Sequence, residues 1–331
     1  MGGNALNRYN VYTDRIDKET YDAIVLKIKE QLDYDGIICY IPEVINDKSD
    51  FGDIDILIKD HSSMYNYIKY VFKPDAIYAN DKFFSFNVKY LGVNVQIDFI
   101  NIPERCWDMK VYYTNDPVGN LMGNLARGVG LFYGDCGLYY KYNSSILNGT
   151  SVLFISRNPE EIFKFYGLDY ERFLNGFDDV MDIYSYIINS RLFVKSLYQY
   201  ENLSHNDRNR KSRRDNYNYF LSYIYDKNFP DQIKDLDKFD LFSEVKKYFN
   251  VDIDVFISSI KEKEKYKMKI KNKYNGKLIL EKFPLEKKEL GFYMNKFKNK
   301  FKTEEEFNEF VLSSDDIMGE FEKILKKNNE I

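Results

Sequence analysis

Alternating and helical runs of apolar residues divide the first hundred residues into the elements of a sheet domain. Apolar positions recur at helical spacing over 19–33, and 37–41 is a short apolar run that predicts a buried strand. Residues 51–58 alternate in polarity, which predicts a strand with two different faces. A helix around 62–72 and strands over 83–91 and 93–101 follow. This order predicts an α+β fold with one mixed sheet.

The second half of the chain has a mainly helical pattern. A helix over 118–129 and a hairpin over 137–156 come first, and Pro159 is then well placed to begin a helix. A last amphipathic helix is expected over 303–327. These changes in pattern predict an α+β domain over 1–152, a helical domain over 153–250 and a basic, mainly helical C-terminal segment over 251–331.

Two residue counts exclude whole classes of chemistry. The chain has only two histidines, which argues against a His-rich zinc site and a Ser-His-Asp triad. Its three cysteines, Cys39, Cys106 and Cys136, are odd in number and lack CxxC spacing, so neither a disulfide framework nor a zinc ribbon is expected. The remaining candidates are carboxylates, Lys, Arg, hydroxyl groups and a hard cation such as Mg²⁺.

The net charge of −4 conceals an uneven distribution. The segment 261–302 contains 15 Lys and 5 Glu, so it carries about +10 and the rest of the chain about −14. Such a segment fits either a contact with a polyanion or a merely solvated surface. The start of the chain has no apolar signal core, and no run approaches the ~18 apolar residues of a membrane helix. We therefore expect a cytoplasmic protein without a membrane partner.

The strongest chemical signal is a set of three aspartates on two predicted strands. Asp53 and Asp55 are two residues apart and therefore share a face, and Asp98 lies on the polar face of the later strand. If these strands are neighbours, three carboxylates converge, and cations are needed to offset their repulsion. Two Mg²⁺ ions at such a site promote phosphoryl transfer. The alternative is a solvated strand face, since acid-x-acid triplets also arise by chance; Asp252-Ile253-Asp254 is one that we expect to cap a helix.

The run SDFGDIDILI at 49–58, followed by VQIDFIN at 95–101, resembles the DNA polymerase β-like nucleotidyltransferase superfamily. The resemblance implies that Asp53, Asp55 and Asp98 are the catalytic residues and bind Mg²⁺ or Mn²⁺. It further implies that Asp98 helps to deprotonate an attacking hydroxyl. The expected reaction transfers a nucleoside monophosphate from an NTP and releases pyrophosphate.

One part of the family signature is displaced. A Gly-Ser or Gly-Gly pair is expected about ten residues before the first aspartate, but 41–50 contains no glycine. The chain instead begins with Gly2-Gly3-Asn4-Ala5-Leu6, which resembles small viral, phage and fungal nucleotidyltransferase-like proteins with a GG-x-A-[LF] start. We expect this loop, with Arg15 and Gly52, to fold back and bind the nucleotide phosphates. A disordered start is the alternative.

Basic residues suggest where nucleic acid would bind. Arg127 is expected beside the site, in contact with phosphates or in a structural salt bridge. An RNA contact is expected through the Lys-rich segment 261–302, whose aromatic residues suit single-stranded nucleic acid. It is also expected through a second cluster made of Arg208, Arg210, Lys211, Arg213 and Arg214.

Together these features predict a Mg²⁺-dependent nucleotidyltransferase, with ATP as the default donor and an RNA 3′ end as the favoured acceptor. A weak similarity of the C-terminal region to CCA-adding enzymes and poly(A) polymerases favours that acceptor. Two alternatives remain open: nucleotidylation of a protein or small molecule, as in an AMP-transferring toxin, and a non-catalytic nucleic-acid-binding module.

Overall fold

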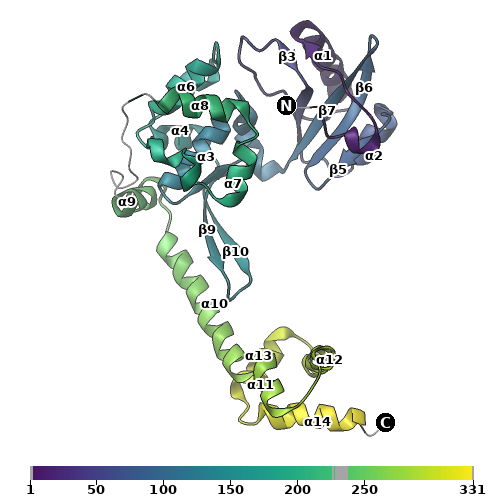
Figure 1. Cartoon of the computed structure of the whole chain (residues 1–331), viewed down its shortest axis with the longest axis vertical. Helices are drawn as coiled ribbons and strands as arrows, with labels where there is room; N and C mark the ends of the chain where they lie inside the picture. Colours follow the sequence, from purple (N-terminus) through teal and green to yellow (C-terminus); the bar gives the residue numbers. More distant parts are fainter. Residues whose placement is uncertain (1–2, 226, 228–237, 330–331) are drawn as a thin grey trace. The chain divides into compact units, whose positions relative to one another are not determined.

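The computed structural model describes residues 3–225, 227 and 238–329. The chain forms two compact units, which are treated separately below (Figure 1). The first consists of 1–140 and 153–251, and the second of 141–152 and 252–331. The first unit thus contains both the predicted sheet domain and the predicted helical domain, while the tip of the 137–156 hairpin belongs to the second.

A mixed sheet forms the framework of the first unit, as the sequence predicts, and it has five strands because β5 (Ile77–Ala79) joins the four predicted ones. Its strand order is β2 (Cys39–Tyr40), β4 (Asp53–Lys59), β7 (Val93–Ile102), β6 (Phe83–Tyr90) and β5 (Ile77–Ala79). β4 and β7 are parallel, and the other neighbouring strands are antiparallel. A separate small pair joins β1 (Ile16–Asp17) to β3 (Asp50–Phe51).

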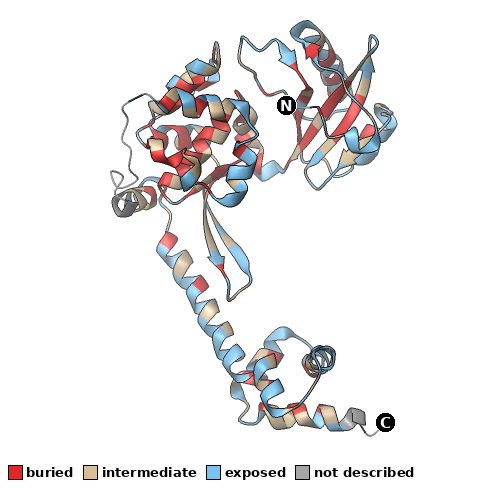
Figure 2. Cartoon of the chain, viewed as in Figure 1, coloured by how far each residue is buried: buried red, intermediate tan, exposed pale blue. Residues whose placement is uncertain are grey.

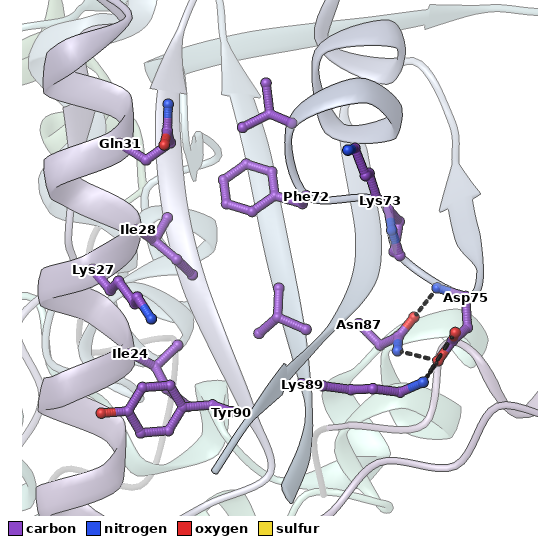
Figure 3. A pocket seen from close by; sticks show the side chains of 13 residues that line it. Ile24, Lys27, Ile28, Gln31, Phe72, Lys73, Asp75, Asn87, Lys89 and Tyr90 are labelled. Atoms are coloured by element: carbon purple, nitrogen blue, oxygen red, sulfur yellow. Dashed lines mark hydrogen bonds and ion pairs between the residues drawn. The ribbon is translucent and has the colours of Figure 1, made fainter. Parts of the chain in front are cut away.

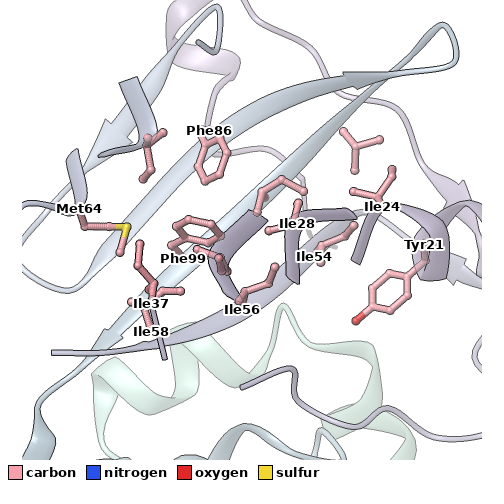
Figure 4. Close-up of a cluster of buried hydrophobic side chains, with 14 of the residues drawn as sticks. Tyr21, Ile24, Ile28, Ile37, Ile54, Ile56, Ile58, Met64, Phe86 and Phe99 are labelled. Carbon is pink, nitrogen blue, oxygen red and sulfur yellow. The ribbon is translucent and has the colours of Figure 1, made fainter. Parts of the chain in front are cut away.

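One face of this sheet is covered by α1 (Lys18–Tyr34) and α2 (Met64–Val71). Asp17 caps α1 by accepting a hydrogen bond from the Thr20 N–H at 2.8 Å. The apolar side of α1 packs on alternate residues of β4 and β7, and all of these side chains are buried (Figure 4). The core members are Tyr21, Ile24, Ile28, Leu32, Ile54, Ile56, Ile58, Ile97 and Phe99. Because side chains alternate along a strand, this packing leaves Asp53, Asp55 and Asp98 on the opposite face.

The opposite face becomes apolar towards the ends of β4 and β7. Leu57, Ile100 and Ile102 form a small core with Cys106, in the 3₁₀ segment η2 (Glu104–Tyr113). Cys106 and Cys136 are joined by a disulfide, so the expectation that the cysteines form no disulfide is wrong. Their 30-residue separation carries no local spacing signal, because the fold alone brings them together. Cys39 remains a free thiol.

The rest of the first unit is mainly helical, with a buried interior (Figure 2). Its longer helices are α3 (Val118–Gly128), α4 (Pro159–Tyr166), α6 (Val180–Ile188), α7 (His205–Lys211), α8 (Asp215–Tyr225) and α9 (Lys238–Phe249), with the short α5 (Tyr170–Leu174). Pro159 begins α4 as predicted, after an Asn158 cap. Strands β8 (Phe132–Gly134), β9 (Gly137–Ser144) and β10 (Gly149–Ser156) form a three-stranded sheet.

The second unit is helical and has its own hydrophobic core. It contains α10 (Ile253–Lys273), α11 (Gly276–Lys282), α12 (Lys287–Lys298), α13 (Glu304–Ser313) and α14 (Ile317–Asn329). Asp252 caps α10, as expected for the chance acid-x-acid triplet. The single helix expected over 303–327 is wrong, because α13 ends at Ser313, the first residue of a polar Ser-Ser-Asp-Asp run. Asp316 then accepts a hydrogen bond from the Gly319 N–H at 2.8 Å, which starts a new helix.

Candidate active site

The register of two parallel strands brings the predicted aspartates together. β4 and β7 are neighbours, and Asp55 pairs with Asp98 while Asp53 pairs with Gln96. Neighbouring strands lie about 4.8 Å apart, and Asp53 projects to the same side as Asp55. On the far side of Asp98, its partner in β6 is Ser85. The three carboxylates therefore share one patch of the sheet.

Hydrogen bonds hold Asp98 in place within this patch. The Gln96 side-chain amide donates to Asp98 Oδ1 at 2.9 Å, and the Ser85 hydroxyl donates to the same carboxylate. Gln96 is itself fixed, because its Oε1 accepts a hydrogen bond from the Ala5 N–H at 3.0 Å. Sequence reasoning missed Ser85 and Gln96, although both lie on the polar face of their strands.

The protein environment disfavours negative charge on two of these aspartates. Desolvation by the surrounding protein, with the charges of Asp53 and Asp98, raises the pKa of Asp55 to about 8. By surface area Asp55 is exposed, so solvent reaches a carboxylate that protein surrounds on most sides. Desolvation is also the main cause that raises the pKa of Asp98 to about 6, against the opposing hydrogen bonds from Ser85 and Gln96.

Two charged residues of the site lie in loops that sequence reasoning did not single out. Asp116 precedes Pro117 in the connection to α3, and its charge acts on Asp55. Burial raises the pKa of Asp116, against the positive charges of Arg214 and Lys48. The positive charge of Lys48 lowers the pKa of Asp55, whereas the negative charge of Asp116 raises it. A fourth carboxylate and one lysine therefore flank the three predicted aspartates.

The N-terminal loop folds back onto the first aspartate. The Gly3 N–H donates to Asp53 Oδ2 at 3.1 Å, and the Gly3 carbonyl accepts from the Thr13 hydroxyl at 2.7 Å. Gly3 has a φ of +83°, and a Cβ there would lie 2.2 Å from the Gly52 carbonyl oxygen, so only glycine fits this approach. Gly3 and Gly52 thus lie at the site as a packed pair, with the Gly3 amide directed at Asp53. Gly2 lies outside the described residues.

The two arginines predicted to bind the nucleotide have different positions. Arg15 lies at the edge of the site, where its guanidinium pairs with Asp50 at 2.7 Å and its pKa responds to the charge of Asp53. Arg127 lies on α3 and pairs with Asp207 of α7 at 3.2 Å. Arg15 is therefore close to the carboxylates, whereas Arg127 belongs to a separate cavity.

The donor set determines which cation would fit. Among the described residues, no group of three or more His, Cys, Asp or Glu side chains is arranged to hold a metal ion. Mg²⁺ commonly binds through one or two carboxylates together with substrate phosphates and water, without a complete protein cage. Asp55 and Asp98 provide such a pair of oxygen ligands, and their pKa values are raised by desolvation first and by neighbouring aspartates second. These two carboxylates therefore suit a Mg²⁺ ion that is also bound by a substrate phosphate.

A cavity of about 390 Å³ lies on the α1 side of the sheet, beside the end of β6 (Figure 3). Two of its four charged groups are paired: Asp75 accepts from the Asn87 amide at 2.9 Å and pairs with Lys89 at 2.9 Å. None of the predicted site residues lines it. The candidate chemistry therefore lies with the aspartates, on the other face.

The residues expected to contact RNA lie in both units. Arg210, Lys211 and Arg214 line a cavity of the first unit, whereas Arg208 and Arg213 are exposed outside it. In the second unit, every lysine of 261–302 except Lys267 is exposed. Exposed aromatic rings of Tyr266 and Phe292 lie among these lysines in the sequence. The segment 261–302 therefore presents many cations to solvent.

We expect the stability of the metal-free protein to fall as pH rises through the pKa values of Asp55 and Asp98. Both pKa values are above 3.8, the ordinary value of an aspartate, so the folded state binds these protons more tightly than the unfolded chain. The resulting stabilisation is complete below about pH 4 and is lost as pH rises through about 6 and about 8. Urea unfolding in EDTA at pH 5 and pH 8.5 measures it.

Asparagine at position 55 isolates this effect. Asparagine is neutral in both the folded and the unfolded state, so the stability of Asp55→Asn relative to the wild type should increase from pH 5 to pH 8.5. Asp47→Asn, at an exposed loop carboxylate, serves as the control and should leave the pH dependence unchanged. If the stability of Asp55→Asn and of the wild type depended equally on pH, the raised pKa of Asp55 would be contradicted.

Among the described residues, no helix is both long and apolar enough to cross a membrane.

Neither a protein-family model nor a curated protein matches this chain.

Proposed function

We propose that this protein is a Mg²⁺-dependent nucleotidyltransferase with a DNA polymerase β-like catalytic domain. It would transfer a nucleoside monophosphate from an NTP, with ATP as the default donor, to the 3′ hydroxyl of an RNA. The observation that carries the proposal is the parallel pairing of β4 with β7, which sets Asp55 beside Asp98 with Asp53 on the same face. This is the arrangement that the sequence resemblance to the superfamily requires.

The three aspartates have distinct roles in this proposal. Asp53, Asp55 and Asp98 would hold the cation, and Asp98 would also accept the proton of the attacking hydroxyl at its carboxylate. When bound, Mg²⁺ supplies a positive charge that stabilises the phosphate oxygens during transfer. A pKa of about 6 leaves Asp98 ionised at neutral pH, as a proton acceptor must be. Gln96 and Ser85 orient Asp98 for that step.

The N-terminal loop has a positioning role at this site. Its Gly3 amide holds Asp53, and its Ala5 amide holds Gln96, which in turn holds Asp98. The loop is therefore connected to two of the three aspartates by hydrogen bonds. We assign the loop a role in fixing the carboxylates, because the Gly3 N–H that was expected to contact phosphate donates to Asp53.

The basic second unit supports RNA as the acceptor. The exposed lysines of α10, α11 and α12 offer many contacts to phosphates, and such binding weakens steeply with salt. Nucleotidylation of a protein or small molecule would need no such surface. The RNA proposal therefore predicts that acceptor binding has a steep negative dependence on log salt concentration.

The test is label transfer from each of the four α-³²P NTPs, with Mg²⁺ or Mn²⁺, in the presence and absence of mixed RNA. A ladder of labelled RNA would support the proposal and identify the preferred base in one gel. Label on protein alone would favour the nucleotidylation alternative. No transfer under any condition, with the protein shown to be folded, would overturn the proposal in favour of a binding module.

A further inference from the structure

A second cavity in the first unit has a composition unlike that of the aspartate site. Its volume is about 250 Å³, and it lies between α3, α7 and the β8–β9 turn. Four cationic side chains line it: Arg127, Arg210, Lys211 and Arg214. Two carboxylates also line it, Asp135 and Asp207. The walls therefore carry an excess of positive charge.

Ion pairing within the walls leaves part of this charge uncompensated. Asp207 pairs with Arg127 at 3.2 Å and also accepts from the Ser204 hydroxyl at 2.7 Å, while Asp135 pairs with Lys82. In the part of the chain that the structure describes, no carboxylate forms an ion pair with Arg210 or Arg214. These two guanidinium groups are therefore available to an anion.

Lys211 is a buried cation at this cavity, with 4% of its surface exposed. Its ammonium donates to Asn124 Oδ1 and lies 4.5 Å from the centre of the Tyr217 ring. Desolvation, followed by the positive charge of Arg127, lowers the pKa of Lys211 to about 7. The charges of Arg210 and Arg214 also lower the pKa of Lys211, and the charge of Asp207 raises it. A bound anion would offset this repulsion.

Glycines and aromatic rings give the cavity its space. Gly119, Gly123 and Arg127 are four residues apart on α3 and share one face of the helix. A Cβ at Gly123 would have only the Tyr133 carbonyl oxygen within 4 Å, at 3.9 Å, so this position opens onto free space. Tyr133 and Tyr139 add ring surface to the walls. The cavity thus combines cations with flat apolar surface.

We propose that this cavity binds the terminal phosphate of a nucleotide, either a phosphomonoester or a polyphosphate. Guanidinium groups recognise such oxygens through paired hydrogen bonds, and a tyrosine ring can accommodate the attached base or sugar. The same chemistry is offered by a free nucleotide and by the 5′-phosphorylated end of an RNA.

The first test is calorimetric titration with inorganic tripolyphosphate in EDTA, which separates this site from any metal-dependent chemistry. Arg210→Gln and Arg214→Gln should each weaken binding by about tenfold or more, as expected for a lost charged hydrogen bond. Arg208→Gln and Arg213→Gln are matched controls, because they remove the same charge just outside the cavity, and should change the affinity by less than about twofold. Equal losses in both pairs would overturn the proposal.

Two further variants test the cavity itself. Gly123→Leu fills the space without changing the charge and should abolish binding. The thermal midpoint should be kept, because leucine has a higher helix propensity than glycine. Asp207→Asn removes the opposing charge and should tighten binding. Unchanged affinity in Gly123→Leu, with the folded state confirmed by circular dichroism, would place the anion elsewhere and overturn the proposal.

Matched ligands identify the source of the phosphate. ATP compared with adenosine tests the free nucleotide, and one RNA with a 5′-phosphate or a 5′-hydroxyl tests the RNA end. In either pair, tighter binding of the phosphorylated ligand supports the proposal if Arg210→Gln removes the difference in affinity. The pair that shows this difference identifies the source of the phosphate. No preference in both pairs would overturn it. Because these titrations need no Mg²⁺ and no transfer, their failure is distinguishable from failure of the proposed activity.

Discussion

Asp98→Asn should lower the rate of nucleotidyl transfer by roughly 10²–10⁴-fold, the usual contribution of a positioned general base. Asparagine keeps the shape of the side chain and can still accept a hydrogen bond, but it cannot take up a proton and is a weaker ligand for Mg²⁺. Asp55→Asn should cause a comparable loss through the cation alone. The measurement is the initial rate of label transfer to RNA at saturating NTP.

The control for these variants is Asp254→Asn. Asp254 belongs to the acid-x-acid triplet at the start of α10, which lies in the other unit and is exposed. This variant should keep the wild-type rate. A second readout is the rise in thermal midpoint on adding Mg²⁺ and NTP, which should disappear in Asp55→Asn. If Asp98→Asn retained more than a third of the wild-type rate, the assignment of the active site would be wrong.

Phe297→Ala should destabilise the second unit by about 3–5 kcal/mol, as expected for a large aromatic residue removed from a core. Phe297 is 1% exposed and lies at the centre of the aromatic cluster of this unit. Its ring neighbours are Tyr274, Phe301, Phe307, Phe310 and Phe321. A loss of this size is a large part of the stability of a small helical module. Scanning calorimetry should show one transition moving to much lower temperature.

Phe292→Ala provides the matched control on the same helix. Phe292 is 57% exposed, so its removal leaves no cavity and should change stability by less than about 1 kcal/mol. RNA binding should weaken in Phe297→Ala at temperatures where the second unit has unfolded, while tripolyphosphate binding to the first unit persists. A joint shift of all transitions in Phe297→Ala would show that the two units do not unfold separately.

The elements that could be predicted from the sequence are those with a local signal. Alternation over 51–58 and 93–101 predicts the strands and the face of each aspartate, because the twofold repeat of a strand is a property of its own residues. The start of α4 at Pro159 and the Asp252 cap of α10 follow from local backbone preferences. The sequence alone does not show that β4 and β7 are neighbours. Their pairing depends on contacts between distant segments.

The features that could not be predicted depend on contacts between distant segments. Asp116 lies in a loop, where no periodicity marks a residue as belonging to a site. The cavity lined by Arg127 and Arg210 joins α3 to α7, which are about 80 residues apart in the chain. The Cys106–Cys136 disulfide and the docking of Gly3 on Gly52 likewise depend on the completed fold. Residue type indicated that these groups could be reactive or basic, but not where they would meet.

The pairing of β4 with β7 also determines how relatives of this protein would differ in length. A one-residue shift within either strand would turn its aspartate into the core, so insertions there should be excluded. The chain between the two strands passes through α2, β5 and β6, whose connections lie at the surface and tolerate added residues. A search pattern should therefore fix the alternation around Asp53, Asp55 and Asp98 and leave the 43-residue interval free. Patterns with a rigid interval would overlook divergent members that keep the same sheet.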